Sequence, residues 1–408
     1  MAKSSSKRLE QTTFKLQSLL NITLAINENL SKDELLQRYE KLIREDFNIG
    51  VLVLFTFDGS WKCILCSGAD ENAYRNINVD KDLTPYTEIS FVTDTSDADS
   101  LLNYDIVMPV YNKGKALAYV VLGDIEEGEG VSPIIKHLNF IQTLSNIILV
   151  AIENIRLFNE SLKQQALKKE LELASKMQSM LIPSQSMLPK NDRLCISAFY
   201  HPHLEVGGDY YDYIQLSKDL VGFCIADVSG KGMSAALLMS NFQANLRAMF
   251  TNEISLEALV EKLNDRVLHS ANGEKFITMF VGKFNFKTRE MVYINAGHNQ
   301  PILYLQKSDQ IIYLDKGCVG MGMLDEIPLI KKGTMYLEEP AKLLCYTDGL
   351  VELMDGKGIS LETNELENCL KNNKSIENNI DEVIEKQGVF EGTTKIFDDI
   401  SILGIEIF

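Results

Sequence analysis

The sequence predicts a multidomain α+β protein, and three patterns along its 408 residues carry this prediction. Residues 1–158 alternate between amphipathic helices and short apolar strands. Residues 138–182 keep an apolar spacing of three and four, which is typical of one long helix. Residues 190–408 hold many short apolar strands joined by tight turns. We therefore expect a small α/β domain, a linker helix and a larger sandwich of mostly antiparallel sheets with helices outside.

The composition is that of a globular protein with a strong acidic balance. The chain is 45% hydrophobic and 24% charged, and its net charge is -17. Such a charge disfavours nucleic acid and anionic membranes as partners, and it is compatible with cation binding. The N-terminus lacks an apolar signal segment, and the apolar run at 147–152 is too short to span a membrane. We expect a cytoplasmic protein without a membrane span.

The seven cysteines lie mostly inside apolar strands, which is typical of reduced, buried thiols. Cys63 and Cys66 form a C-x-x-C pair, but the chain has no second pair to complete a zinc site. The segment around them is a predicted strand, in which residues three apart face opposite ways. A zinc site is therefore not expected here.

The first domain, predicted over residues 1–158, begins with helices and continues with two pairs of strands. Ser31 and Glu34 form a capping box at the start of the second helix. Strands are expected at 50–57, 62–67, 106–111 and 115–123, the last two as a hairpin. This layout and the phrase IVMPVYNKGKALAYVVLGD resemble a GAF domain, a small sensory fold. The resemblance implies either a site for a small-molecule or protein activator, or a role in dimerisation alone.

The linker helix, predicted over residues 138–182, carries an interrupted coiled-coil seam. Its apolar seam positions are Ile141, Leu144, Ile148, Ala151, Ile155, Phe158 and Leu162, followed by Leu167, Leu171, Ala174, Gln178 and Leu181. The two sets are separated by a jump of five at Lys163–Ala166, and such a break changes the local winding of a supercoil. Two interpretations stay open, a switch that transmits a signal to the second domain and a plain dimerising helix. Both predict a homodimer.

Aspartates in matching positions indicate a site in the second domain. Asp209 follows two glycines, Asp227 precedes a glycine-rich turn, Asp348 ends an apolar strand, and Asp398 and Asp399 open the last strand. Converging carboxylates without Cys or His are hard oxygen ligands, which suit Mg²⁺ or Mn²⁺. Because like charges repel, a shared cation is what keeps such a set ionised. The alternative for each residue alone is a turn cap; as a set they favour a metal site.

Seven motifs in order resemble one bacterial enzyme family. They are ELELASKMQSMLIP, VGGDYYDY, DVSGKGMSAALLMS, FITMFVGKFN, YINAGHNQPILY, YTDGLVE and FDDISIL, spread over about residues 170–408. Together they resemble the PPM-type, PP2C-like serine/threonine phosphatases of the SpoIIE and RsbU family. The resemblance implies an α/β-β/α sandwich over residues 190–408. It also implies two Mn²⁺ or Mg²⁺ ions that activate a bridging water against phosphoserine or phosphothreonine.

The same resemblance implies roles for individual residues. Asp227 is expected to bridge the two metals, with the backbone carbonyl of Val228 as a further ligand, and Asp348 and Asp398 complete the sites. Asp209 corresponds to a more peripheral acid that acts through water. Asp399 is a less favoured alternative to Asp398, and Asp212 is expected to be structural. His298 is expected to fix a loop, with a general-acid role as the alternative.

The expected substrate, by resemblance, is a phosphorylated anti-anti-sigma protein of the STAS type, a partner-switching protein. The N-terminal domain would regulate the hydrolysis through the linker. Two other functions remain open, a catalytically silent dimeric sensor or scaffold and a metal-dependent nuclease. The intact set of acids disfavours the scaffold, and the net charge disfavours the nuclease.

Overall fold

The computed structural model describes residues 2–69, 74–92, 99–112, 114–125, 137–353, 363–389 and 396–408. It divides into two compact units, Met1–Gln165 and Ala166–Phe408, and each is described by itself.

The first unit is built on one antiparallel sheet with the strand order β2-β1-β5-β4-β3. Its elements are α1 (Ala2–Asn27), α2 (Lys32–Lys41), β1 (Ile49–Phe57), β2 (Trp61–Ser67), β3 (Ser90–Phe91), β4 (Ile106–Asn112), β5 (Lys115–Ile125) and the first part of α3 (Leu138–Ser179). One face of the sheet packs against side chains of α1, α2 and α3, and the other face packs against the segments that join β2 to β4. The expected pair β4–β5 is present and antiparallel, with Asn112 opposite Lys115; Lys113 in its turn lies outside the described residues.

The predicted capping box is confirmed at the start of α2. The Ser31 hydroxyl accepts from the Glu34 N–H at 3.3 Å, and a Glu34 carboxylate oxygen accepts from the Ser31 N–H at 2.8 Å. The predicted apolar face of this helix is also buried, with Leu35 and Tyr39 both 0% exposed.

Cys63 and Cys66 do not face opposite ways, so the expectation from regular strand geometry is wrong. The pairing of β1 with β2 places Leu54 opposite Leu65 but Phe55 opposite Cys63, which leaves one residue of β2 as a bulge. The bulge shifts the alternation by one residue, so both cysteines lie on the same face of the sheet. Both are free thiols.

Helix α3 has 42 residues and passes from the first unit into the second. The first seam residues, Ile141, Leu144 and Ile148, are fully buried against the sheet of their own unit, so their spacing reflects packing within that unit. Further along, Phe158 is 64% exposed and Leu167 is 58% exposed. By length and composition alone α3 could cross a membrane, and 39% of its most apolar window is buried in the structure.

The second unit contains two sheets. The first has the order β13-β10-β9-β8-β7 with β14 paired to β10, and the second has the order β12-β11-β15-β16-β6. The strands are β6 (Leu194–His201), β7 (Tyr210–Gln215), β8 (Leu220–Val228), β9 (Ile277–Asn285), β10 (Glu290–Ala296), β11 (Ile302–Leu305), β12 (Gln310–Tyr313), β13 (Gly317–Cys318), β14 (Gly333–Tyr336), β15 (Ala341–Tyr346) and β16 (Ile400–Ile407). The helices are α4 (Met233–Met249), α5 (Leu256–Ala271), α6 (Asp348–Val351), α7 (Thr363–Leu370) and α8 (Ile376–Lys386).

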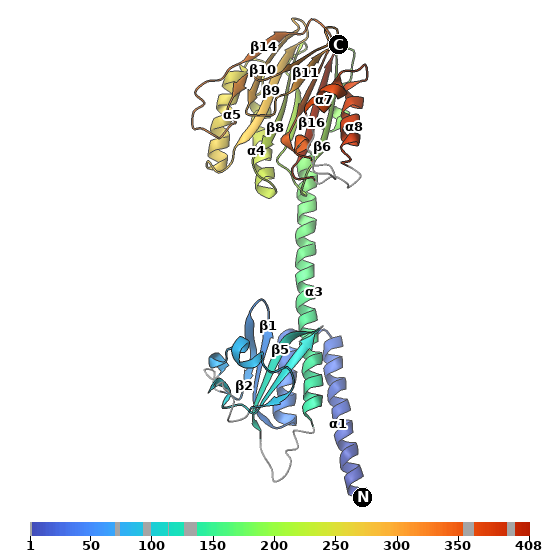
Figure 1. Ribbon diagram of the computed structural model, residues 1–408, viewed down its shortest axis with the longest axis vertical. Helices are drawn as coiled ribbons and strands as arrows, with labels where there is room; N and C mark the ends of the chain where they lie inside the picture. The colour runs from blue at the N-terminus through green and yellow to red at the C-terminus, as the bar shows by residue number, and fades with distance from the viewer. Residues whose placement is uncertain are drawn as a thin grey trace. The chain divides into compact units, whose positions relative to one another are not determined.

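Alternation along the strands makes these sheets the inner layers of a sandwich. On β15, Leu343 and Cys345 join a core that also holds residues of β8 and β9, whereas Leu344 and Tyr346 join a core with α7 and α8. Helices α4 and α5 contact the other sheet, so each sheet has helices on its outer side, as Figure 1 shows. Every strand pair in this unit is antiparallel except the short parallel pair β10–β13.

Candidate active site

Strand pairing brings the predicted acids together at one end of the sandwich. In the first sheet Tyr210 pairs with Ala226, so Asp209 at the start of β7 lies beside Asp227 near the end of β8. In the second sheet Tyr346 pairs with Ile402, so the end of β15 lies beside the start of β16. Asp348 and Asp398 flank that end. Each sheet therefore contributes two acids through an antiparallel pair.

Three of these acids line one small pocket. Asp227, Asp348 and Asp398 surround a volume of about 270 Å³. The other lining residues are Val228, Ser229, Gly230, Phe276, Thr278, Gly297, His298 and Asn299. A larger groove of about 1030 Å³ lies in the first unit, between the segments 26–31 and 146–159, but no ionisable side chain lines it. The three predicted acids thus meet in the smaller of these two pockets.

The pocket carboxylates are poorly neutralised by the protein. Burial, with the charge of Asp348 added, raises the pKa of Asp227 to about 7. Burial also raises the pKa of Asp348, and the neighbouring Glu352 adds to the shift. Among the described residues the one cation paired with any of the three acids is Lys231, whose Nζ lies 2.9 Å from a carboxylate oxygen of Asp398. A proton or a bound cation would therefore stabilise the buried Asp227 carboxylate.

Asp209 lies behind Asp227 and does not line the pocket. It is 1% exposed and accepts a hydrogen bond of 2.8 Å from the Thr347 hydroxyl. Burial and the charge of Asp227 raise its pKa well above the ordinary value. The carboxyls of Asp209 and Asp227 are close enough to share a hydrogen bond, which needs a proton on one of them. Asp209 is thus buried beside Asp227 and outside the residues that line the pocket.

Asp398 and Asp399 are adjacent in the chain but make different contacts. Asp398 lines the pocket. Asp399 accepts backbone N–H bonds on both carboxylate oxygens, at 2.7 Å from His203 and 2.5 Å from Gly208. Those bonds hold the loop before β7. The placement favours Asp398 as the residue available to an ion, because Asp398 lines the pocket and Asp399 does not.

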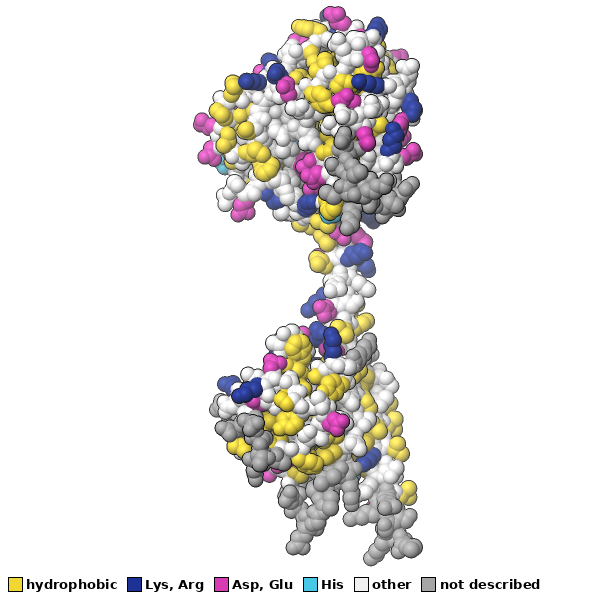
Figure 2. Space-filling model, viewed as in Figure 1, with side chains coloured by type: hydrophobic (Ala, Val, Ile, Leu, Met, Phe, Trp, Pro, Cys, Tyr) yellow, Lys and Arg dark blue, Asp and Glu magenta, His cyan; other side chains and the backbone are white. Residues whose placement is uncertain are grey.

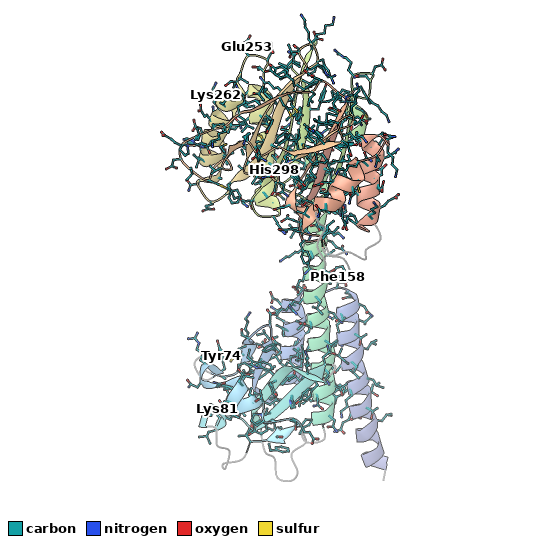
Figure 3. All side chains as sticks on the ribbon, turned by 45° about the horizontal axis from the view of Figure 1, so that its top comes forward. Tyr74, Lys81, Phe158, Glu253, Lys262 and His298 are labelled. Carbon is teal, nitrogen blue, oxygen red and sulfur yellow. The ribbon has the colours of Figure 1, made fainter. Side chains whose placement is uncertain are left out.

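His298, labelled in Figure 3, lines the pocket and is buried. Its Nδ1 is 2.9 Å from the Thr278 hydroxyl, and its backbone N–H donates to the Asn295 side chain at 2.8 Å. Burial lowers the pKa of the imidazole to about 4, so the ring is neutral at pH 7. These contacts support the predicted role in fixing the loop, and a neutral ring is a poor proton donor.

The donor set of the pocket fits hard cations. Within the described residues, no three His, Cys, Asp or Glu side chains are grouped so as to enclose a single ion. The three carboxylates approach from separate elements instead, and Val228, whose carbonyl oxygen is a further donor, lies beside Asp227 on β8. Carboxylate and carbonyl oxygens are ligands that suit Mg²⁺ or Mn²⁺. Acids spread around a pocket suit two ions that share a ligand better than one enclosed ion.

Comparison with known proteins agrees with this fold and pocket. The model of the family "Stage II sporulation protein E (SpoIIE)" matches residues 217–408. The C-terminal part of the chain is therefore similar in sequence to the SpoIIE family. The SpoIIE match includes Asp227, Asp348 and Asp398, whereas Asp209 lies before its first residue.

Two relatives from Bacillus subtilis (strain 168) are similar to about half of the chain. Phosphoserine phosphatase RsbU is 28% identical over 208 residues, covering 51% of this chain and 61% of RsbU. Phosphoserine phosphatase RsbP is 30% identical over 190 residues, covering 45% of this chain and 46% of RsbP. The chain thus spans about half the length of these relatives.

A solved structure supports the fold alone. The SiaA-PP2C domain of Pseudomonas aeruginosa aligns with a TM-score of 0.51 at 17% identity, covering 60% of this chain and 99% of that domain. The predicted PP2C-like fold of the C-terminal domain is confirmed at this level.

Sequence reasoning missed the contacts that join distant segments around the pocket of Asp227, Asp348 and Asp398. The Lys231 ammonium pairs with Asp398 and also donates to the Phe397 carbonyl. The Thr347 hydroxyl links Asp209 to β16, because it accepts from the Ser401 N–H at 2.9 Å. The motifs contain these residues, but nothing in their spacing indicates which side chains meet.

Proposed function

We propose that this chain is a metal-dependent protein serine/threonine phosphatase. The observation that carries the proposal is the pocket in which Asp227, Asp348 and Asp398 converge from two sheets while their charges stay largely uncompensated. Two bound Mn²⁺ or Mg²⁺ ions would supply a water activated for in-line attack and would neutralise phosphoryl oxygens. Their requirement for oxygen ligands matches the residues present.

The protein residues divide this work by position. Asp227, from the first sheet, shares the pocket with Asp348 and Asp398 of the second sheet. It is therefore the residue suited to bridge two ions, with the Val228 carbonyl beside it. Asp348 and Asp398 approach from the second sheet. Asp209 stands behind Asp227 and is suited to act through water, while Asp399 holds the loop that carries Asp209.

The substrate we propose is phosphoserine or phosphothreonine on a partner-switching protein, such as a STAS-type anti-anti-sigma factor. Support comes from the relatives RsbU and RsbP, both of which are phosphoserine phosphatases. The pocket is about 270 Å³ and suits the phosphorylated end of a side chain better than a large cofactor. The net charge of -17 argues against a nucleic-acid substrate.

Regulation by the N-terminal unit is part of the proposal. Its sheet with helices on one face supports the GAF-like prediction, and a small-molecule or protein activator would act there. Apolar side chains on α3 at Leu157, Phe158, Leu162 and Leu167 are between 47% and 64% exposed, and Figure 2 shows apolar side chains interspersed with charged ones along this helix. A second copy of α3 would cover them, which supports a homodimer. Our proposal also places this homodimer in the cytoplasm.

The first experiment is Mn²⁺-dependent hydrolysis of a generic phosphate ester by the full chain. We expect turnover that EDTA abolishes, and a loss of about 10³-fold or more in Asp227→Asn and Asp348→Asn, because each removes a ligand charge from the reacting centre. Asp381→Asn, at an exposed position on α8, is the control and should keep full activity. A fragment that begins at Glu170 should differ in turnover from the full chain if the N-terminal unit regulates it.

Two results would contradict the proposal. Turnover that persists in EDTA, or in Asp227→Asn, would place the chemistry elsewhere. A chain that neither hydrolyses the ester nor binds Mn²⁺ in a direct titration would leave the silent scaffold as the better description.

A further inference from the structure

Gln178, near the end of α3, is a buried polar residue in an apolar row. Its neighbours in that row are Leu171, Ala174 and Leu181. Gln178 is 7% exposed, and burying an amide is unfavourable unless its hydrogen bonds are made. Packing alone would be served better by leucine at this position. The glutamine therefore calls for an explanation in terms of what it binds.

Both ends of the Gln178 side chain bind the backbone of one residue, Gly207. Its Nε2 donates to the Gly207 carbonyl at 2.6 Å, and its Oε1 accepts from the Gly207 N–H at 3.1 Å. The amide thereby reproduces the pair of bonds that a neighbouring strand would make. A two-bond contact fixes both the position and the orientation of the peptide that it holds.

The segment held in this way carries Asp209 and packs against the Val228 carbonyl of β8, and both belong to the proposed metal site. Asp209 follows Gly207 by two residues. A Cβ added to Gly207 would meet an Asp399 carboxylate oxygen at 2.5 Å, and one added to Gly208 would meet the Val228 carbonyl oxygen at 2.9 Å. The loop therefore lies tightly between Asp399 and the carbonyl that is expected to bind an ion. A shift of the loop would move Asp209 and open space beside Val228.

We propose that Gln178 is a positioning residue that sets the geometry of Asp209 and of the Val228 carbonyl, and thereby the metal affinity of the site. This inference rests on the proposed phosphatase function for its catalytic consequence. Residues that orient metal ligands from outside the coordination sphere commonly change metal affinity or activity by about 10- to 100-fold when replaced. Gln178 acts in this way from the linker helix.

The test uses the full chain and the variant Gln178→Met, which keeps length and apolar volume but removes both hydrogen bonds. Gln185→Met is the matched control, because the Gln185 amide also makes two bonds in this unit, to the Ser197 hydroxyl at 3.0 Å and the Ala198 N–H at 3.1 Å, without touching the loop. Three quantities are measured: Mn²⁺ affinity by titration of the free-ion electron paramagnetic resonance signal, ester hydrolysis, and amide hydrogen exchange of residues 203–209 in EDTA. Thermal unfolding reports whether both variants fold.

We expect Gln178→Met to fold, to bind Mn²⁺ and hydrolyse the ester about 10- to 100-fold more weakly, and to lose exchange protection in the loop. Gln185→Met should match the parent in all three. Equal Mn²⁺ affinity and hydrolysis in the two variants would overturn the inference. If the parent chain binds no Mn²⁺, the proposed function has failed, and the exchange data still decide whether Gln178 holds the loop: unchanged protection in Gln178→Met overturns the inference there as well.

Discussion

Asp212 and Asp227 lie on the neighbouring strands β7 and β8, and the protein treats their charges in opposite ways. Asp212 is 0% exposed and receives two bonds from the Arg247 guanidinium, at 2.7 and 2.8 Å, and a third from the Tyr210 hydroxyl. Asp227 also lies largely out of water but faces Asp348 and Asp398 across the pocket. Asp212 thus belongs to a network in which its charge is neutralised, whereas the charge of Asp227 on the adjacent strand is not.

The comparison teaches that burial of an acid does not by itself indicate function. The Asp212 network is complete because Arg247, the Tyr210 hydroxyl and the Tyr213 backbone N–H supply its donors, and it ties α4 to the sheet. Its bonds also raise the pKa of Arg247 above the ordinary value. Among the described residues no cation pairs with Asp227, so burial and the charge of Asp348 raise its pKa instead. A missing counter-charge inside a pocket is the feature that identifies a place for an ion.

The largest effect on stability is expected when the completed network is broken. Arg247→Met leaves the Asp212 carboxylate buried without its cation, which should lower the free energy of unfolding by about 2–3 kcal/mol, since the Arg247 side chain is itself 47% exposed. Urea unfolding measures the loss, and added Mn²⁺ should not restore it. Arg193→Met is the control, because its ion pair with Asp219 at 3.3 Å is exposed and should contribute far less. A loss that Mn²⁺ reverses would show that Arg247 belongs to the metal site.

In metal-free protein above pH 7, Asp227→Asn should raise the free energy of unfolding, the opposite of the effect of Arg247→Met. With a pKa of about 7 when folded and an ordinary value of 3.8, the Asp227 carboxyl binds a proton in the folded state that the unfolded state has released between these pH values. Its contribution to stability therefore falls as pH rises from about 4 to 7, by about 1.4 kcal/mol for each pH unit. Above pH 7 the contribution stays low. Asparagine removes this dependence.

Thermal unfolding in EDTA at pH 5.5 and pH 8 checks that sign. The parent should lose more stability than Asp227→Asn between the two values, and Asp227→Asn should be the more stable protein at pH 8. Added Mn²⁺ at pH 8 should stabilise the parent and leave the variant unchanged. A parent and variant with parallel pH profiles would show that Asp227 is ionised and satisfied without a metal.

The difference between these two networks also marks what the sequence could predict. The capping box of Ser31 and Glu34 was predictable because both partners lie within one turn of helix. The convergence of Asp227, Asp348 and Asp398 was predictable because antiparallel neighbours bring strand ends together, and the motifs placed each acid at such an end.

Contacts that depend on the register of distant segments were not predictable. Arg247 is 35 residues from Asp212, and nothing in its helix distinguishes it from a solvated cation. The bulge that turns Cys63 and Cys66 to one face arises from the pairing of β1 with β2, and regular alternation gave the wrong result. The one local signal for Gln178 was a polar residue in an apolar row, which indicated an exception without naming its partner.

The smallest effect is expected at Lys231, the one cation among the described residues that pairs with a pocket acid. Its side chain is 40% exposed and that of Asp398 is 29% exposed, so their ion pair should contribute less than about 1 kcal/mol to stability. Lys231→Met should therefore unfold like the parent. Because the ammonium pairs with a carboxylate that the proposed ions would need, its removal should tighten Mn²⁺ binding by about 2- to 5-fold, the factor that corresponds to such a weak pair.

Calorimetric Mn²⁺ titration of the parent and two variants tests this competition. Lys275→Met is the control, because its ammonium donates to the Ser229 carbonyl at 2.7 Å in the same loop but does not pair with an acid of the pocket. It should not tighten Mn²⁺ binding. Weaker binding in Lys231→Met would mean that the lysine supports the loop that follows Val228 and does not compete for Asp398. The pocket would then be as dependent on its own cation as the Asp212 network is on Arg247, and the contrast between the two aspartates would be one of degree.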